Sequence, residues 1–356
     1  MPPILRRPTD ADRSAWDAFV ASRPEADLLQ AWAWGACSAL ADEQPARVLL
    51  EEDGRLRGVA QALIRPAGFG RTVAYVAHGP IWERSAPDAD ELLSSLLVGI
   101  RALGEDHRAL VVKLDPRADV VDTTDIIALA RRHRLRRAPD LQAATTRIVD
   151  LLDGGEQLEA SWQADGRRLS RRAEREGTAV TISRNPEPEE VGILHDLLTR
   201  TAERSDFRVR PLEFLARLAA EFAASGGWYL GIARVEGTPI AAMAFPRVGD
   251  RAYYLYGALL RDPAYKHHYG SHAVMAHMLR ALAGDGCTSV DMWGVVEPDD
   301  PHADPAWRGF SDFKRIFGGA PLRHPGLFDL VTDPIWYWLR EARQRLYSAF
   351  AIGDRD

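Results

Sequence analysis

One short stretch, residues 309–319, carries the side chain best suited to chemistry. Its Lys314 is one of three lysines, with Lys113 and Lys266, among 45 basic residues that are otherwise arginine. A compact ammonium suits a point contact to a phosphate or a developing oxyanion, whereas a guanidinium prefers planar, bidentate partners. Glycines at 309, 318 and 319 predict a tight loop around a short element. Lys314 is therefore a candidate catalytic residue, and the alternative is a solvated lysine on a helix surface.

A second candidate lies at the end of an apolar, strand-like run, 111–115, in which Asp115 precedes Pro116. A carboxylate at a strand end can hold an attacking ammonium or accept its proton. It can equally cap the strand before the proline. The sequence leaves both interpretations of Asp115 open.

An RNA contact in this chain needs a local basic patch, because the formal net charge of −6 excludes a uniform basic coat. The run 167–175 offers such a patch on one helical face, at positions i, i+3, i+4 and i+7. The arginines on that face are Arg168, Arg171, Arg172 and Arg175. They are candidates for binding tRNA phosphates, or they belong to a solvated helix and pair with Glu174 and Glu176. No DNA partner is expected.

Neither a metal site nor a cofactor is expected. His272 and His277 are spaced i, i+5, which suits no common helical pair of metal ligands. Cys37 and Cys287 are the only cysteines and lie far apart, which fits a reducing compartment. The N-terminal residues form no apolar segment and no run reaches the length of a membrane span, so the expected location is the cytoplasm.

An internal duplication predicts the fold that positions these residues. Each half contains a glycine hairpin, a third strand, a helix and a buried strand. In the first half these are 51–64, 71–76, 91–100 and 111–115; in the second they are 235–245, 251–256, 273–279 and 290–294. Tyr75 precedes Arg101 by 26 positions, and Tyr254 precedes Arg280 by the same 26. We predict two α/β domains with mixed sheets, 1–153 and 154–323, the first completed by a C-terminal helical segment, 324–356.

This order of elements is also that of the GNAT acyltransferase fold, so two tandem GNAT-like domains are expected. Acyl-CoA-dependent GNAT enzymes bind pyrophosphate on an Arg/Gln-x-x-Gly-x-Gly/Ala turn at a helix start. Neither half contains that turn, and its nearest approach, 266–272, has one glycine. An acyl-CoA-dependent N-acyltransferase is therefore the weaker alternative, and another activated acyl donor is expected.

Several motifs together resemble one family. In chain order they are LLQAWAWG (28–35), YVAHGPI (75–81), KLDP (113–116), RRAEREG (171–177), TAERSDFRVR (201–210), YLYGA (254–258), DMWGV (291–295) and FK (313–314). Their order and spacing resemble the Fem family (FemA, FemB and FemX), which are tandem-GNAT aminoacyltransferases. Members of that family move an amino acid from aminoacyl-tRNA onto an amine of a peptidoglycan precursor. The resemblance therefore implies this activity, this donor and this acceptor.

The resemblance also implies a role for each matching residue. Lys314, with Phe313 before it, would lie beside the reacting acyl group, and Asp115 would border the acceptor peptide. Arg210 would bind a phosphate of a nucleotide-linked or lipid-linked acceptor. The other implied substrate-binding positions are Tyr254, Tyr256, Trp34 and Phe214.

Two departures leave the acceptor open. The family often has a phosphate-binding lysine where this chain has Ser38, and it favours tyrosine where this chain has Phe214. Both changes remove polar contacts to a pyrophosphate. The alternative acceptor is a peptide-like intermediate of antibiotic or natural-product biosynthesis, and a protein that only binds tRNA or precursor is a further alternative. The charged helical-hairpin insertion of staphylococcal Fem proteins is not expected in this chain.

The C-terminal segment 334–340 is amphipathic and aromatic. Such a segment can pack its aromatic face back onto the first domain. It is also a candidate for peripheral membrane contact near a lipid-linked acceptor.

Overall fold

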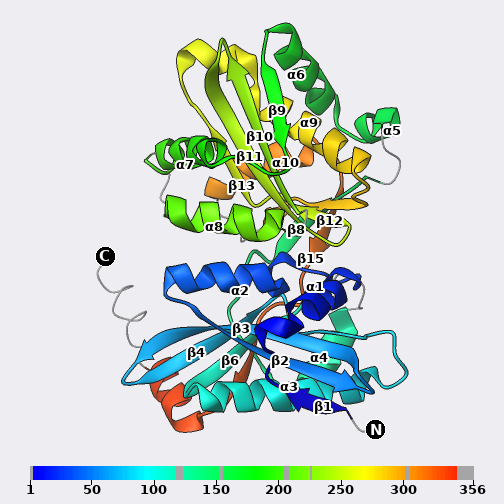
Figure 1. The fold of residues 1–356 in the computed structure, drawn as a ribbon, viewed down its shortest axis with the longest axis vertical. Coiled ribbons are helices and arrows are strands. Elements are labelled where there is room, and N and C mark those ends of the chain that lie inside the picture. The colour runs from blue at the N-terminus through cyan, green and yellow to red at the C-terminus, as the bar shows by residue number, and fades with distance from the viewer. Residues whose placement is uncertain are drawn as a thin grey trace. The chain divides into compact units, whose positions relative to one another are not determined.

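The computed structural model of the chain describes residues 3–117, 123–151, 155–203, 208–224, 227–300 and 305–342. These residues form two compact units, which are coloured in sequence order in Figure 1. Unit 1 comprises Met1–Leu141 and Pro325–Asp356, and unit 2 comprises Gln142–His324. Each unit is built around one mixed sheet, so the predicted α/β class is confirmed.

The sheet of unit 1 has eight strands. They are β1 (Ile4–Arg6), β2 (Gln44–Glu52), β3 (Arg55–Gly68), β4 (Arg71–Ala77), β5 (Ile81–Trp82), β6 (Ala109–Asp115), β7 (Arg136–Arg137) and β16 (Phe328–Val331). Their order is β1-β2-β3-β4-β6-β16-β7, with β5 paired to β3. Strands β4 and β6 run parallel, and the other pairs are antiparallel.

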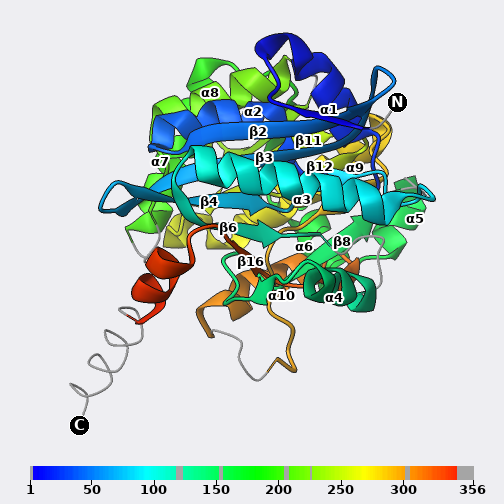
Figure 2. The same ribbon diagram turned by 90° about the horizontal axis from the view of Figure 1, so that it is seen from below.

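Helices cover both faces of this sheet. Helix α3 (Ala89–Asp106) crosses one face, and α1 (Arg13–Ala21) and α2 (Trp32–Ser38) lie on the other (Figure 2). Helix α4 (Thr123–Arg132) precedes β7. The core under α3 joins its leucines to alternate residues of β2, such as Val48 and Leu50, because successive side chains of a strand point to opposite faces.

The sheet of unit 2 also has eight strands. They are β8 (Thr145–Asp150), β9 (Ala179–Ser183), β10 (Trp228–Val235), β11 (Thr238–Val248), β12 (Arg251–Tyr253), β13 (Tyr256–Leu259), β14 (Ser289–Asp291) and β15 (Ala320–Arg323). Their order is β15-β8-β14-β12-β11-β10-β9, with β13 paired to β11. Strands β12 and β14 run parallel.

The helices of unit 2 are α5 (Gly155–Ala160), α6 (Ala164–Arg175), α7 (Pro188–Ala202), α8 (Leu212–Ala223), α9 (Gly270–Gly284) and α10 (Arg308–Arg315). Helix α9 packs over β10 and β11 with its buried residues Val274, Met278 and Leu282. Helices α7 and α8 contact each other and also the strands β10 and β11.

The predicted duplication is confirmed. Unit 1 contains β2-β3-β4-α3-β6 and unit 2 contains β10-β11-β12-α9-β14, each with the crossover helix joining the two parallel strands. A right-handed crossover through a helix is the usual way to connect parallel neighbours. The equivalent parallel pairs therefore end at Asp115 in unit 1 and at Asp291 in unit 2.

One inner strand of each sheet lies outside the duplicated order of elements. Strand β8, which was expected in the first domain (1–153), pairs with β14 and β15 in the sheet of unit 2. Strand β16 enters the sheet of unit 1 between β6 and β7. Because of the first of these pairings, the division between the units falls at 141/142, earlier than the boundary expected at 153/154.

The C-terminal helix, residues 334–342, partly packs onto unit 1. Its Tyr337 is buried with Leu110 and Val111, and the Tyr337 hydroxyl donates to Asp329 at 3.0 Å. Within the described residues, no helix combines the length and the hydropathy needed to span a bilayer.

Candidate functional site

The predicted catalytic and substrate-binding residues fall into two groups, one in each unit. Lys314, Phe313 and Tyr254 belong to unit 2, whereas Asp115 and Trp34 belong to unit 1. Each group is built by the residues of its own unit.

Lys314 lies in the last turn of α10; Gly309 is the second residue of this helix, and Gly318 and Gly319 follow its end. Gly318 and Gly319 follow the helix with φ of +86° and +77°, a region that favours glycine. A Cβ on Gly319 would lie 2.4 Å from the carbonyl oxygen of Ile148 on β8. Glycine at this position therefore lets the end of α10 approach the sheet closely enough to bury Lys314.

Lys314 is only 7% exposed. Its Nζ donates to the carbonyl oxygen of Gly294 at 2.8 Å, just beyond the end of β14. The same Nζ lies 4.9 Å from the ring centroid of Phe310 and 5.5 Å from that of Tyr254. An ammonium has three N–H donors, and the described residues supply one hydrogen-bond acceptor, so donors remain for a ligand.

Burial lowers the pKa of Lys314 to about 8, while the charge of the buried Asp291 opposes that shift. Asp291 ends β14 and is itself held by the hydroxyl of Thr146 and by the backbone N–H of Trp293. At neutral pH Lys314 is therefore a mostly protonated cation in a poorly solvated site, where its charge acts strongly on a neighbouring group.

Tyr254 forms part of the wall around Lys314. Its ring stacks on Phe245 at 5.1 Å between centroids, and burial raises the pKa of its hydroxyl. A Cβ on Gly257 would lie 1.9 Å from that hydroxyl, so the glycine of the YLYGA motif makes room for the ring. Tyr256 is half-buried on β13.

Phe313 is half-buried and packs against the core of unit 2. Its ring packs against His272 at 5.2 Å and against Phe317 at 5.5 Å between centroids. Burial lowers the pKa of His272 to about 4, so this imidazole is neutral at pH 7. A direct catalytic role of Phe313 stays a prediction.

Arg210 and Phe214 lie together at the start of α8. The Arg210 guanidinium lies 5.0 Å from the centroid of the Phe214 ring, and that ring is buried. Arg210 is half-buried, and none of the described contacts joins it to Lys314. Phosphate binding by Arg210 therefore stays a prediction.

In unit 1, Asp115 is buried at the end of β6 and accepts a hydrogen bond from the Tyr75 hydroxyl of β4 at 2.8 Å. The parallel pairing of β4 with β6 brings these two strand ends together. Burial raises the pKa of Asp115, although His78 and the Tyr75 hydroxyl oppose that shift. A raised carboxyl pKa improves a proton acceptor.

A buried charged cluster beside Asp115 was missed by the sequence analysis. Asp27 accepts hydrogen bonds from His78 Nδ1 at 2.9 Å, from Arg117 and from the backbone N–H of Leu29 at 2.7 Å. All three charged side chains are nearly inaccessible to solvent. In the sequence, Asp27 directly precedes the motif LLQAWAWG, His78 lies inside YVAHGPI and Arg117 directly follows KLDP. This proximity to three motifs was the signal that could have indicated the cluster.

Trp34 is half-buried on α2. Ser38, at the end of the same helix, is 1% exposed. The position at which the Fem family often has a phosphate-binding lysine is therefore closed to solvent in this chain.

The predicted basic face lies on α6. Arg168 pairs with Asp165 at 2.8 Å, Arg171 with Glu159 at 3.7 Å and Arg172 with Glu176 at 3.3 Å. Arg175 is exposed at the end of the helix. Exposed pairs of this kind contribute little energy, so they leave the arginines able to exchange a carboxylate for a phosphate.

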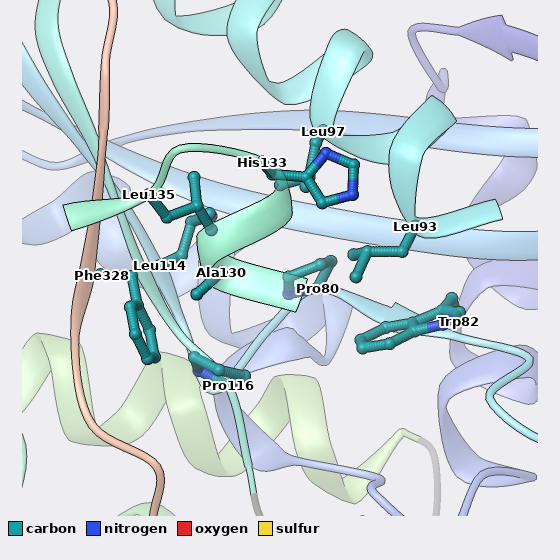
Figure 3. A pocket seen from close by; sticks show the side chains of 10 residues that line it. All are labelled: Pro80, Trp82, Leu93, Leu97, Leu114, Pro116, Ala130, His133, Leu135 and Phe328. Atoms are coloured by element: carbon teal, nitrogen blue, oxygen red, sulfur yellow. The ribbon is translucent and has the colours of Figure 1, made fainter. Parts of the chain in front are cut away.

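The apolar pocket of unit 1 opens next to Pro116, the residue after Asp115 (Figure 3). Its side chains come from the segment after β4, from the end of β6, from α3, from α4 and the residues that follow it, and from β16. His133 is the one titratable residue in this lining. They are Pro80, Trp82, Leu93, Leu97, Leu114, Pro116, Ala130, His133, Leu135 and Phe328. Such a lining suits an apolar group and not a phosphate. Among the described residues, no cluster has the composition of a metal site.

Comparison with known proteins identifies relatives of the whole chain. The family described as an acetyltransferase (GNAT) domain matches residues 160–315. A lipid II:glycine glycyltransferase of Staphylococcus epidermidis is 22% identical over an alignment of 406 positions, which covers 94% of this chain and 95% of the relative. Because that alignment is longer than the 356 residues of this chain, the relative has segments that are missing here.

Solved structures share the fold. The crystal structure of FemX superposes with a TM-score of 0.83 at 20% identity, over 94% of this chain and 99% of FemX. A tandem GNAT protein from the clavulanic acid biosynthesis pathway superposes with a TM-score of 0.57 at 12% identity, over 93% of this chain and 99% of its own. The predicted tandem GNAT fold is thereby confirmed.

Proposed function

We propose that this chain, which is a FemX-like tandem GNAT protein, transfers an amino acid from aminoacyl-tRNA to an amine of a peptidoglycan precursor. The relatives that match along 94% of the chain are named for glycyl transfer to lipid II, which supports bridge formation between stem peptides. The observation that carries the proposal is the buried ammonium of Lys314. Among the described residues it donates one hydrogen bond, to the carbonyl oxygen of Gly294, and burial lowers its pKa.

The chemistry requires little more than positioning and charge. The acceptor amine forms a C–N bond to the carbonyl carbon of the aminoacyl ester, the ester C–O bond breaks, and the ribose hydroxyl leaves as the amine loses a proton. Correct positioning contributes up to about 7–11 kcal/mol in well-oriented systems. One donor aimed at the oxyanion contributes about 3–4 kcal/mol, and Lys314 is our candidate for that donor. Asp115 is our candidate acceptor of the amine's proton, on account of its burial and raised pKa.

An aminoacyl-tRNA donor fits two features of the chain. The CoA-pyrophosphate turn is missing from both halves, and α6 presents arginines on an exposed face. We assign phosphate contacts of the tRNA to Arg168, Arg171, Arg172 and Arg175. An acyl-CoA donor is the alternative; micromolar CoA binding in calorimetry would support it.

Two positions bear on the acceptor. Ser38 and Phe214 are both 1% exposed, so neither position offers a polar contact to a pyrophosphate. Nucleotide-linked and lipid-linked precursors both carry a pyrophosphate, and the relatives named for transfer to lipid II support the lipid-linked one. A peptide-like natural-product intermediate is the second candidate, because it lacks the pyrophosphate.

The decisive experiment measures transfer of radiolabelled amino acids from a mixed, charged tRNA pool to three acceptors: lipid II, UDP-MurNAc-pentapeptide and a free stem peptide. Wild type is compared with Lys314→Ala and with Lys266→Ala, a matched control on an exposed segment. We expect transfer to lipid II, a loss of about 10²–10³-fold in Lys314→Ala and less than a two-fold change in Lys266→Ala.

Two outcomes would contradict parts of this proposal. Full activity of Lys314→Ala would remove Lys314 from the chemistry. Transfer to none of the three acceptors, with tRNA binding intact, would move the search to natural-product intermediates or to a protein that binds without catalysis.

A further inference from the structure

Unit 1 exposes apolar side chains from two segments that are far apart in the sequence. One segment is the turn between β3 and β4, and the other is the C-terminal helix 334–342. Both views place the helix beside the strand ends of this hairpin (Figures 1 and 2). The rings of Phe69 and Trp336 join the segments, with centroids 5.9 Å apart. We call Phe69, Ile335, Trp336, Trp338 and Leu339 the aromatic surface.

The contact of the Phe69 ring with Trp336 leaves most of the Phe69 side chain exposed. That side chain is 78% exposed, and the Phe69 backbone has a φ of +51° between two glycines that also have positive φ. That region suits glycine or asparagine and strains a bulky side chain. A polar residue would build the same turn at lower cost, so the exposed ring indicates a contact outside the fold.

The C-terminal helix has two apolar faces. One face packs inward through the buried Tyr337. Ile335, Trp338 and Leu339 are 73%, 45% and 57% exposed, and their spacing of i, i+3 and i+4 puts them on one stripe. One face of the helix therefore packs onto unit 1, as expected, and the other face stays largely exposed.

Arginines lie among these apolar side chains. The Arg71 guanidinium is 5.4 Å from the centroid of the Trp336 ring, and that of Arg136 is 4.6 Å from the Trp338 ring. Arg340 follows on the same helix. The carboxylate of Asp333 lies here too and pairs with Arg71 at 3.0 Å. This local arrangement of cations contrasts with the net charge of −6 of the whole chain.

We propose that the aromatic surface docks unit 1 onto an anionic lipid bilayer. Phe69, Ile335 and Leu339 would enter the acyl boundary, and Trp338 would lie at the headgroup level, where indole rings concentrate. Arg71, Arg136 and Arg340 would face the anionic headgroups. This inference rests on the proposed function to the extent that a lipid-linked acceptor is itself a membrane component.

A bilayer fits these residues better than a second copy of the chain. The apolar side chains stand on a hairpin tip and along a helix edge, where they can enter a fluid layer without a shaped partner. The three arginines outnumber the two carboxylates of this region, Asp333 and Glu341, and Asp333 already pairs with Arg71. The excess of cations complements phosphate headgroups better than a second copy of the same surface.

The test is co-sedimentation of the full chain with vesicles of phosphatidylcholine alone and with vesicles that contain 30% phosphatidylglycerol. The variant Phe69→Asn, Ile335→Gln, Leu339→Gln removes the apolar tips, and asparagine tolerates the positive φ of position 69. The matched control Leu40→Gln, Val98→Gln, Leu141→Gln removes three apolar side chains that are also exposed, by 44%, 64% and 52%.

We expect wild type and control to bind anionic vesicles and the aromatic-surface variant to bind at least about five-fold more weakly. Binding should decrease at 0.5 M salt and on neutral vesicles. The inference is overturned if wild type stays in the supernatant or if the variant binds as well as the control. It is equally overturned if the variant only converts a dimer to a monomer in sedimentation velocity.

A second readout separates this inference from the proposed function. The aromatic-surface variant should keep wild-type transfer to a water-soluble acceptor with a shortened lipid chain and lose transfer to lipid II in vesicles. Vesicle binding without any transfer would leave the docking surface standing and reject the proposed activity. If the wild type transfers the amino acid to the soluble acceptor but does not bind vesicles, the proposed activity stands and the docking surface is rejected.

Discussion

Lys314 is a cation held where water is scarce. Its folded pKa of about 8 compares with 10.5 for an exposed lysine, a difference that corresponds to about 3 kcal/mol of unfavourable interaction with the charged form. Lys113, by contrast, is buried with a carboxylate partner, Asp329, at 2.7 Å. The charge of Lys314 therefore has a stability cost that the hydrogen bond to Gly294 and the charge of Asp291 offset only in part.

We predict that Lys314→Met raises the free energy of unfolding at pH 7 by roughly 1–2 kcal/mol, because relief of desolvation exceeds one lost hydrogen bond of about 1 kcal/mol. The folded pKa lies below the unfolded one, so the wild type gains stability as the pH rises from about 8 to 10.5. The advantage of the variant should accordingly shrink across that range. Urea unfolding at pH 6.5 and pH 9.5 measures both effects.

Lys113→Met is the matched control, since it leaves Asp329 buried without its partner. We expect it to destabilise unit 1 by about 3 kcal/mol. If Lys314→Met destabilises the protein at pH 7 by a similar amount, the buried ammonium is a structural group and its assignment to catalysis loses its physical basis.

At the scale of elements, α10 and the segment after β14 form one support for the site. The Ser311 hydroxyl donates to the carbonyl oxygen of Trp307 and accepts from the backbone N–H of Val296 at 3.0 Å. Arg147 of β8 donates to the carbonyl oxygen of Gly319 at 2.6 Å. These bonds hold α10 against the segment after β14 and hold the turn after α10 against β8. The position of Lys314 is thereby fixed, as preorganised electrostatic stabilisation requires.

Helix α6 is the element on which we expect donor binding to depend. Each phosphate contact contributes close to one unit to the slope of log K against log salt for a duplex. We predict that Arg168→Ala, Arg171→Ala, Arg175→Ala lowers this slope by about 2–3 for tRNA. Filter binding between 50 and 300 mM salt measures the slope.

The control for α6 replaces arginines that lie elsewhere on unit 2, Arg184→Ala and Arg217→Ala, which pair with Asp285 and Glu221. These changes should leave the slope within experimental error. Equal slopes for all three proteins would mean that α6 is an ordinary solvated helix.

At the scale of the whole molecule, the two units depend on strands from distant parts of the chain. Strand β16 is inserted between β6 and β7, and it carries Asp329 to Lys113. Unit 2 includes no residue beyond His324. The C-terminal segment is therefore part of the first sheet and not an appendage.

We predict that a chain ending at residue 324 loses the unfolding transition of unit 1 and keeps that of unit 2, because its first sheet lacks an inner strand. A chain ending at 342 keeps both transitions and serves as the control. Differential scanning calorimetry, with hydrogen exchange to assign each transition, measures the outcome. Two intact transitions in the shorter chain would contradict the proposed role of β16.

The duplicated order of hairpin, strand, helix and strand could be predicted from the sequence because it rests on local periodicity and glycine turns. The same holds for α10, whose end the glycines at 318 and 319 set. The relationship to the Fem family could also be predicted from the sequence, since motifs such as YVAHGPI and YLYGA keep their order and spacing.

The return of the segment after 324 to unit 1 was predicted, but only the tertiary structure decided that this segment adds the strand β16 and that β8 joins the sheet of unit 2, because pairing between distant strands leaves no local pattern. The same is true of the Asp27–His78–Arg117 cluster, whose members come from three separate segments and become a unit only through burial. The C-terminal helix illustrates the reason once more: its composition indicated an apolar face, but which side packs onto unit 1 and which side stays exposed depends on contacts with residues that are hundreds of positions away.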